Sequence, residues 1–239
     1  MPWRERIARG LAYRYVRAHC GWYGRALCER IDGILRFEET AVNLATGEQE
    51  EHALPGFAKY RADGHGRYML GRYLYAIKYV RGKDVLDAGC GLGWGAHLIS
   101  DYPKMLLAVD PDAGAIAFAR RTWQDPRVTF ETASLAQVAG EACFDAVLAF
   151  EVIEHMPYEE GAAFLGDCAR LLRPRGALVL SSHFAAARAE AETMERMNRF
   201  HRHIYTRAEI ERLLSETGFG RRRFLGDFMA VAYRGRAHG

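Results

Sequence analysis

The sequence predicts an α/β fold in which helices cover both faces of a doubly wound, mostly parallel sheet. From residue 83 onward, short apolar runs alternate with stretches of helical pattern, and this alternation is typical of βαβ units. Most of the runs are apolar on both faces, as expected for strands buried under two layers of helices. With 239 residues, of which 49% are hydrophobic, the chain can bury the core of one large domain.

The individual elements follow from local patterns. Strands are expected within residues 84–89, 105–110, 127–132, 143–153 and 177–182, and helices within 93–102, 112–124, 158–173 and 206–218. Asp112 is suited to cap one helix and Thr206 with Glu209 forms a capping box at the start of another, which Gly218 ends. Pro174 is expected to close a helix that runs through Leu171 and Leu172.

The first part of the chain differs in character. Residues 1–75 are rich in Arg, Tyr and Gly and are expected to form a helical cap with loops, ahead of a main domain at 76–239. Charges every few residues exclude a secretory signal, and no run reaches the roughly 20 apolar residues of a spanning helix. Six arginines between residues 4 and 25 alternate with aromatic residues, which fits either packing on the main domain or contact with a membrane surface.

The net charge and the cysteine pattern reduce the number of function classes that the sequence allows. The formal net charge is +3, which argues against a nucleic-acid binder that works by bulk charge. The five cysteines are scattered without a C-x-x-C pair, so reduced thiols in a cytoplasmic protein are expected.

The stretch VLDAGCGLGWG, residues 85–95, is the most informative one. A strand is followed by glycines at 89, 91, 93 and 95 and then by a helix. Glycines permit a sharp turn and a close ligand approach at the carboxyl end of a strand. The turn alone also fits the dinucleotide pattern G-x-G-x-x-A, which keeps an NAD-dependent oxidoreductase open.

Two acidic residues help to distinguish a dinucleotide from a nucleoside that carries a cationic group. Asp87, just before the turn, would repel a pyrophosphate and suits an ammonium group. Asp110 ends the next strand, 21 residues after Gly89, where a carboxylate can hold both ribose hydroxyls. Together they favour a nucleoside with a cationic amino-acid end, as in S-adenosylmethionine (SAM).

Five stretches in this order resemble motifs of class I SAM-dependent methyltransferases. They are residues 85–93, LLAVDPD, FDAVLAFEVIEHMP, LLRPRGALVLSS and 198–219. The chain is most similar to the ubiquinone-biosynthesis-like branch, especially bacterial members associated with surface glycans and natural products, over residues 66–233. The resemblance implies a seven-stranded Rossmann-like sheet and SAM as the cofactor.

The resemblance also implies residue roles. Asp87, Gly89 and Gly91 should line the methionine end of SAM, with Cys90 as a small packing residue in that turn. Asp110 should hold the ribose and Pro111 should lie beside the adenine.

The resemblance implies further cofactor contacts at positions where this sequence matches the family motifs less completely. Ser134 and Leu135 stand near the place of the usual adenine-binding Asp. Phe150 and Glu151 should pass near the methionine and the acceptor, and Arg72 is suited to the methionine carboxylate.

Methyl transfer to a hydroxyl needs alignment of the two reactants and a base of near-neutral pKa. His155, directly after the fourth strand, is the candidate base or orienting residue. Glu154 is a candidate catalytic residue or a residue that fixes the loop. His201 and His203 could bind a metal if they lay on a strand, or could be ordinary residues of a substrate lid at 184–205. Met194 and Met197 are expected to be core contacts.

These observations predict a SAM-dependent methyltransferase. The acceptor is expected to be a small molecule, a sugar unit of a glycan or a natural product, methylated on oxygen, with nitrogen and carbon left open. The alternatives are an NAD-dependent oxidoreductase, a non-catalytic SAM-binding partner subunit and an RNA methyltransferase.

Overall fold

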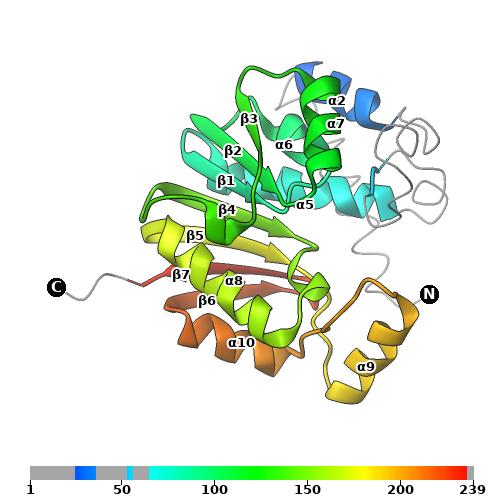
Figure 1. The fold of residues 1–239 in the computed structure, drawn as a ribbon, viewed down its shortest axis with the longest axis vertical. Coiled ribbons are helices and arrows are strands. Elements are labelled where there is room, and N and C mark those ends of the chain that lie inside the picture. Colours follow the sequence, from blue (N-terminus) through cyan, green and yellow to red (C-terminus); the bar gives the residue numbers. More distant parts are fainter. Residues whose placement is uncertain (1–24, 36–52, 56–64, 236–239) are drawn as a thin grey trace.

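A computed structural model describes residues 25–35, 53–55 and 65–235. Its centre is a seven-stranded sheet with the order β3-β2-β1-β4-β5-β7-β6 (Figure 1). The strands are β1 (Asp84–Ala88), β2 (Met105–Asp110), β3 (Val128–Thr132), β4 (Phe144–Phe150), β5 (Leu172–Ser181), β6 (Phe219–Leu225) and β7 (Met229–Arg234). Only β7 runs antiparallel to its two neighbours, and the other pairings are parallel. The predicted doubly wound, mostly parallel sheet is confirmed.

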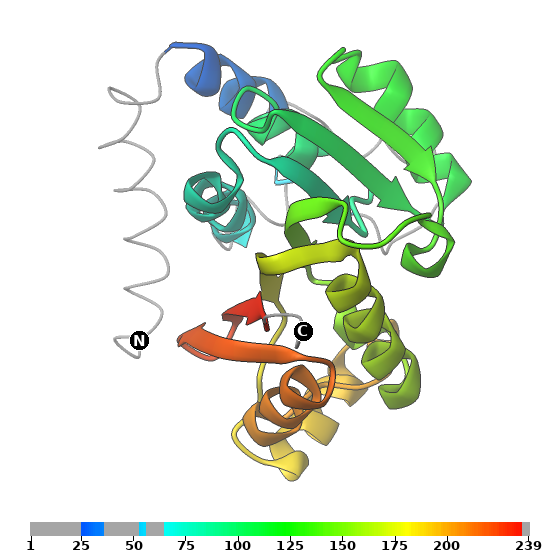
Figure 2. The same cartoon turned by 90° about the vertical axis from the view of Figure 1, so that its left-hand side faces the viewer.

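Helices cover both faces of the sheet. Buried residues of α2 (Arg25–Leu35), α5 (His65–Val80), α6 (Trp94–Ile99) and α7 (Ala113–Trp123) share one apolar cluster. Those of α8 (Tyr158–Leu171) and α10 (Arg207–Glu216) belong to a second cluster. Figure 2 shows α5 and α8 on opposite sides of the strands. Each cluster buries the side chains of one sheet face, so the sheet is the middle of three layers.

The register of the parallel strands brings their ends together. Asp87 lies opposite Ala108 of β2 and Leu148 of β4, so β1, β2 and β4 end at one edge of the sheet. The last residue of β4, Phe150, pairs with Ser181 at the end of β5. Residues that follow these four strands are therefore neighbours, as the rule for ligand sites in open α/β sheets requires.

Helix boundaries agree with the local signals except at one end. The Asp112 carboxylate accepts hydrogen bonds from Gly114 N and Ala115 N, and Thr206 with Glu209 closes a capping box. The prediction that a helix includes Leu172 is wrong. The helix α8 ends at Leu171, and Leu172 is the first residue of β5, where it pairs with Phe144. Pro174 therefore lies within β5. It falls in an irregular stretch between the Leu172–Phe144 pair and the regular pairing with β4 that begins at Ala177.

The described part of residues 1–75 packs on the sheet domain. Helix α5 runs through residue 75, which was the expected boundary, and shares the first apolar cluster with α2. Arg30 of α2 donates to Ser100 Oγ at 2.8 Å and forms an ion pair with Asp101 at 3.0 Å, next to α6. The arginines between residues 4 and 25 and their proposed membrane contact lie outside the residues whose side chains are described.

A separate segment follows β5. It contains α9 (Arg188–Met197) and rejoins the domain through a bridge between Ala185 and Thr206. Met194 packs against the small cluster of Ala185, Ala191 and Ile204, but the predicted core position of Met197 is wrong, since its side chain is 82% exposed at the end of α9. Among the described helices, none combines the length and the apolar character needed to cross a bilayer.

Candidate functional site

The carboxylate of Asp87 lies under helix α5. Its side chain is buried at the end of β1, and the hydroxyl of Tyr73 donates to its two oxygens at 3.2 and 3.0 Å. Burial raises the pKa of Asp87 to about 7, although the bond from Tyr73 opposes this rise and the negative charge of Asp110 adds to it. A cationic ligand group in this position would favour the ionised carboxylate.

The glycine turn after β1 needs its glycines. Gly89, Gly91 and Gly93 have φ values of +74°, +51° and +73°, a region that residues with a Cβ rarely adopt. A Cβ on Gly89 would lie 2.6 Å from a methyl carbon of Val152. Cys90 is buried between them, and burial raises the pKa of its thiol well above the ordinary value. A neutral, buried thiol fits the predicted packing role.

Asp110 joins the turn to the end of β2. Its Oδ2 accepts from Gly91 N at 2.8 Å and its Oδ1 from Asp112 N at 2.9 Å. These two bonds fix the carboxylate at the carboxyl ends of β1 and β2, and its expected contact with the ribose hydroxyls stays a prediction. Pro111 is exposed directly beside it.

The loop after β3 lies next to Asp110. The backbone N–H of Ala133 donates to Asp110 O at 3.0 Å. Ser134 begins the short 3₁₀ turn η1 (Leu135–Gln137), and its N–H and hydroxyl both donate to Gln137 Oε1. Leu135 is buried in the second core cluster. The Ser134 hydroxyl is thus committed to a local cap, and an adenine contact from this loop stays a prediction.

An ion pair between the buried Arg72 and the partly exposed Glu151 connects α5 with the end of β4. Arg72 contacts the carboxylate of Glu151 and donates to Ser181 Oγ at 3.0 Å, while Ser181 donates to Glu151 Oε1 at 2.8 Å. Burial would raise the pKa of Glu151, but Arg72 and the Ser181 bond lower it below the ordinary value. Glu151 has a φ of +55°, which is uncommon for a residue with a side chain and often marks a functional site. Arg72 therefore holds Glu151 here, and its expected contact with a methionine carboxylate stays a prediction.

Aromatic rings close the space between these groups. The ring of Phe150 packs edge-on against Tyr73 at 4.8 Å, and Trp94 does the same at 5.0 Å. Tyr68 stacks under the guanidinium of Arg72 and packs against Phe228 from the hairpin between β6 and β7. Phe228 and Ser181 had no assigned role in the sequence analysis, because their partners come from distant segments.

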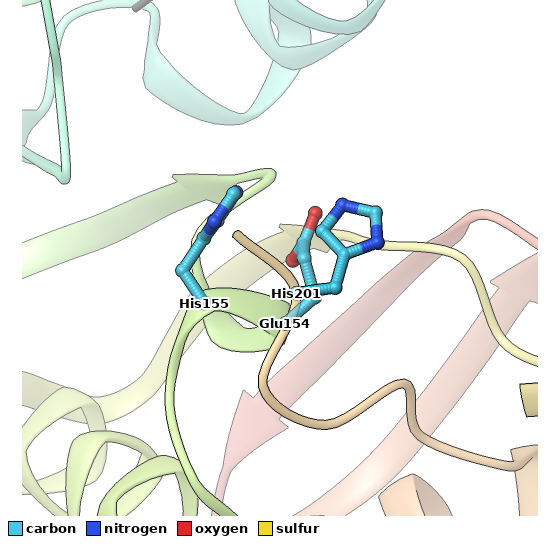
Figure 3. A group of neighbouring side chains, drawn as sticks. All are labelled: Glu154, His155 and His201. Carbon is cyan, nitrogen blue, oxygen red and sulfur yellow. The ribbon is translucent and has the colours of Figure 1, made fainter. Parts of the chain in front are cut away.

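Glu154, His155 and His201 form the second centre of the site. Figure 3 shows the carboxyl of Glu154 between the two imidazole rings, and one ligand atom from each residue lies within 4.8 Å of the others. Glu154 and His155 belong to the 3₁₀ turn η2 (Ile153–His155) after β4, and His201 comes from the segment after α9. Burial, followed by the charge of Glu151, raises the pKa of Glu154 well above the ordinary value.

This cluster differs from the metal pair considered in the sequence. Within the described part of the chain, residues 198–205 form no regular strand, and His203 faces Glu195 and Glu209 at 3.9 and 3.6 Å. His201 joins Glu154 and His155 instead. Carboxylate and imidazole groups are ligands of zinc and similar ions, so these three residues are the described set that can hold a divalent metal.

Comparisons with known proteins agree with the resemblance. The family described as "Methyltransferase domain" matches residues 85–176. A "Probable S-adenosylmethionine-dependent methyltransferase" of Mycolicibacterium smegmatis is 35% identical over 148 residues, which cover 62% of this chain and 56% of that protein. A "Ubiquinone biosynthesis O-methyltransferase" of Methylocella silvestris is 36% identical over 110 residues, covering 45% and 42% of the two chains. The chain thus spans about half the length of the curated relatives it matches.

Solved structures with low sequence identity share the fold. Magnesium protoporphyrin IX methyltransferase from Synechocystis, solved with bound SAH, has a TM-score of 0.53 at 24% identity, over 68% of this chain and 78% of that one. A protein from Bordetella parapertussis described as a possible exported protein has a TM-score of 0.62 at 17% identity, over 98% and 99% of the two chains.

Proposed function

We propose that this protein is an enzyme that methylates a hydroxyl of a small-molecule, sugar or natural-product acceptor. The methyltransferase domain that matches residues 85–176 and the similarity to SAM-dependent methyltransferases support this proposal. The observation that carries the proposal is the pairing of two centres at one edge of the sheet. One contains the carboxylates of Asp87 and Asp110 around the glycine turn, and the other contains His155 and Glu154 after β4.

The first centre fits SAM. Gly89, Gly91 and Gly93 adopt positive φ values in the turn after β1, and the carboxylates of Asp87 and Asp110 stand at the ends of β1 and β2. This arrangement supports a role for Asp87 toward the ammonium group of SAM and for Asp110 toward its ribose. When bound, SAM supplies a methyl group already activated on a cationic sulfur. The protein's own part is then to align donor and acceptor and to take up one proton.

The second centre fits the acceptor. His155 is the candidate to take the proton from a hydroxyl, since imidazole changes its charge near neutral pH. Burial raises the pKa of Glu154 and so favours its neutral form, which can donate or accept a hydrogen bond without adding a charge beside His155. The segment 184–205 contacts this centre, since the N–H groups of Arg202 and His203 donate to Glu154 O, and this contact supports a role as a substrate lid. Relatives named as O-methyltransferases support oxygen as the methylated atom.

The test uses labelled SAM with separate panels of phenols, free and lipid-linked sugars, amines and RNA. We expect label on a hydroxyl compound and strongly reduced transfer in His155→Ala with SAM binding retained. His183→Ala, which changes an exposed histidine nearby, serves as the control.

Other results would contradict the proposal. Tight NAD binding without SAM binding would indicate an oxidoreductase. SAM binding with no labelled product in crude extract would indicate a non-catalytic partner subunit, and label found only in RNA would indicate an RNA methyltransferase.

A further inference from the structure

The end of α9 and the turn that follows it combine an exposed apolar side chain with positive charge. The side chain of Met197 is 82% exposed, the higher value of the two exposed large apolar side chains within the described residues. Arg196 precedes it, and the exposed Arg199 and Arg202 follow closely in sequence. We call residues 196–202 the tip. Figure 1 shows α9, which leads into the tip, at the border of the molecule.

The acidic residues of α9 are paired within the segment itself. Glu192 lies 3.9 Å from Arg188, and Glu195 forms an ion pair with the same arginine and accepts from Ile204 N at 2.8 Å. Glu190 accepts from a backbone N–H just before the helix. These three carboxylates are therefore engaged before the tip begins.

The arginines of the tip have different surroundings. Neither Arg196 nor Arg202 forms an ion pair with any residue that the structure describes, and the one side-chain bond of Arg196 goes to the neutral hydroxyl of Thr193 at 3.2 Å. The guanidinium carbon of Arg199 lies 4.8 Å from the centre of the Phe200 ring. The tip thus presents positive charge beside the exposed Met197.

Hydrogen bonds give the tip a defined shape and join it to the acceptor half of the site. The side-chain oxygen of Asn198 accepts from Phe200 N at 3.0 Å, and His201 N donates to Asn198 O at 3.0 Å. Arg202 N donates to Glu154 O at 2.8 Å. A turn ordered in this way loses less conformational entropy when a partner binds to it.

These properties fit an anionic lipid surface better than a nucleic acid. An arginine near an anionic bilayer strengthens binding by about fivefold, and apolar side chains enter the boundary between headgroups and acyl chains. A single-stranded nucleic acid needs aromatic rings that are free to stack on bases. The ring of Phe200 is half-buried and faces the guanidinium of Arg199 instead.

We propose that the tip docks on an anionic lipid surface, with Met197 in the headgroup region and the guanidinium groups of Arg196, Arg199 and Arg202 facing lipid phosphates. This contact is separate from the arginines between residues 4 and 25. It goes beyond the proposed function and does not depend on it, since docking needs neither SAM nor an acceptor.

The experiment measures sedimentation of the full chain with lipid vesicles, without SAM. We expect binding to phosphatidylcholine vesicles that contain about 30% phosphatidylglycerol and little binding to pure phosphatidylcholine. The double variant Arg196→Gln with Arg202→Gln should bind the anionic vesicles about 25-fold more weakly, about fivefold for each arginine. Arg121→Gln, which removes an exposed arginine of α7, should bind as the unmodified protein does. Unchanged binding by the double variant, or no binding by the unmodified protein, would overturn the inference.

A tryptophan placed in the tip locates the contact. Relative to the unmodified protein, Met197→Trp should add fluorescence that shifts to shorter wavelength with anionic vesicles and is quenched by brominated lipids. Met105→Trp, at the other exposed methionine, should show neither effect. An unshifted signal from Met197→Trp on bound vesicles would overturn the inference, as would single-stranded RNA that displaces the vesicles and loses its own binding in the double variant. Because no methyl transfer is measured, failure here leaves the proposed function intact, and failure of that function leaves the docking result intact.

Discussion

The hydroxyl of Tyr73 donates to both carboxylate oxygens of Asp87, at 3.2 and 3.0 Å, and no other side-chain hydrogen bond to Asp87 is present among the described residues. Helix α5, which lies outside the glycine turn, thereby stabilises the ionised form of Asp87, the residue that is expected to face the ammonium group of SAM.

The first prediction concerns the pH dependence of SAM binding. The pKa of Asp87 is raised to about 7, so in the protein without SAM the group is largely protonated below this pH and ionised above it. A cationic ligand binds the ionised form better, so SAM affinity should fall as pH decreases from 8 to 6. Below the pKa the loss should approach about tenfold per pH unit for one coupled proton. Calorimetry at several pH values measures this, and an identical slope in Asp87→Asn would argue against the assignment.

The same shift affects folding stability. Between the ordinary Asp pKa of 3.8 and the raised value of about 7, the folded chain holds a proton that the unfolded chain has lost. Stability should therefore decrease as pH rises through this window, and the cost of ionised Asp87 is complete above pH 7. Urea unfolding at pH 5 and pH 8 should show Asp87→Asn gaining stability relative to the unmodified chain at the higher pH. An equal effect at both pH values would contradict the shift.

Removal of the Tyr73 hydroxyl tests the helix contact. Tyr73→Phe should raise the pKa of Asp87 further, since the hydroxyl bond is what opposes the effect of burial. The loss of a hydrogen bond to a charged group should cost about 1.5–3 kcal/mol wherever Asp87 is ionised. The pH midpoint of SAM binding should therefore move upward. Tyr75→Phe, on the same helix and bonded only to Tyr79 in the described contacts, should leave the midpoint in place.

The ribose assignment is tested at Asp110. Asp110→Ala should weaken SAM binding by about 1–3 kcal/mol, because polar ribose groups lose their partner. Asp112→Ala is the matched control, since it removes the side-chain cap of α7 and about 1 kcal/mol of stability but keeps the backbone N–H that donates to Asp110 Oδ1. If Asp110→Ala binds SAM as tightly as the unmodified protein does, Asp110 does not hold the ribose.

Two glycines in helices should respond in opposite ways to alanine. A Cβ on Gly95 would lie 1.9 Å from the ring of Tyr73, which Trp94 and Phe150 hold in place, so Gly95→Ala should destabilise by about 1–3 kcal/mol and weaken SAM binding. A Cβ on Gly166 meets no heavy atom within 4 Å, so Gly166→Ala should stabilise by about 0.5–1 kcal/mol. Thermal unfolding with and without SAM measures both effects, and a stabilised Gly95→Ala would refute the packing of Tyr73.

The elements that the sequence predicted correctly are those that depend on local chemistry. The strands around Asp87 and Asp110 follow from apolar runs that end at polar residues, and the caps at Asp112 and Thr206 follow from neighbouring backbone groups. The helix end at Leu171 was misplaced because strand pairing with Phe144 decides the conformation of Leu172.

The parts of the site that sequence reasoning missed depend on tertiary contacts. Nothing local in Tyr73 indicates that α5 crosses over the glycine turn, and nothing in Asn198 or Phe200 indicates that their turn reaches His155. Ser181 lies between Arg72 and Glu151 only because β4 and β5 end side by side. Such partnerships require knowledge of how the strands are ordered in space.

Helix α5 supports two acidic side chains that follow different strands. Its consecutive residues Arg72 and Tyr73 contact different carboxylates, Arg72 that of Glu151 and Tyr73 that of Asp87. A small rotation of this helix would disturb both bonds together. The carboxylates of Asp87 and Glu151, at the ends of two neighbouring strands, therefore depend on the position of the same helix.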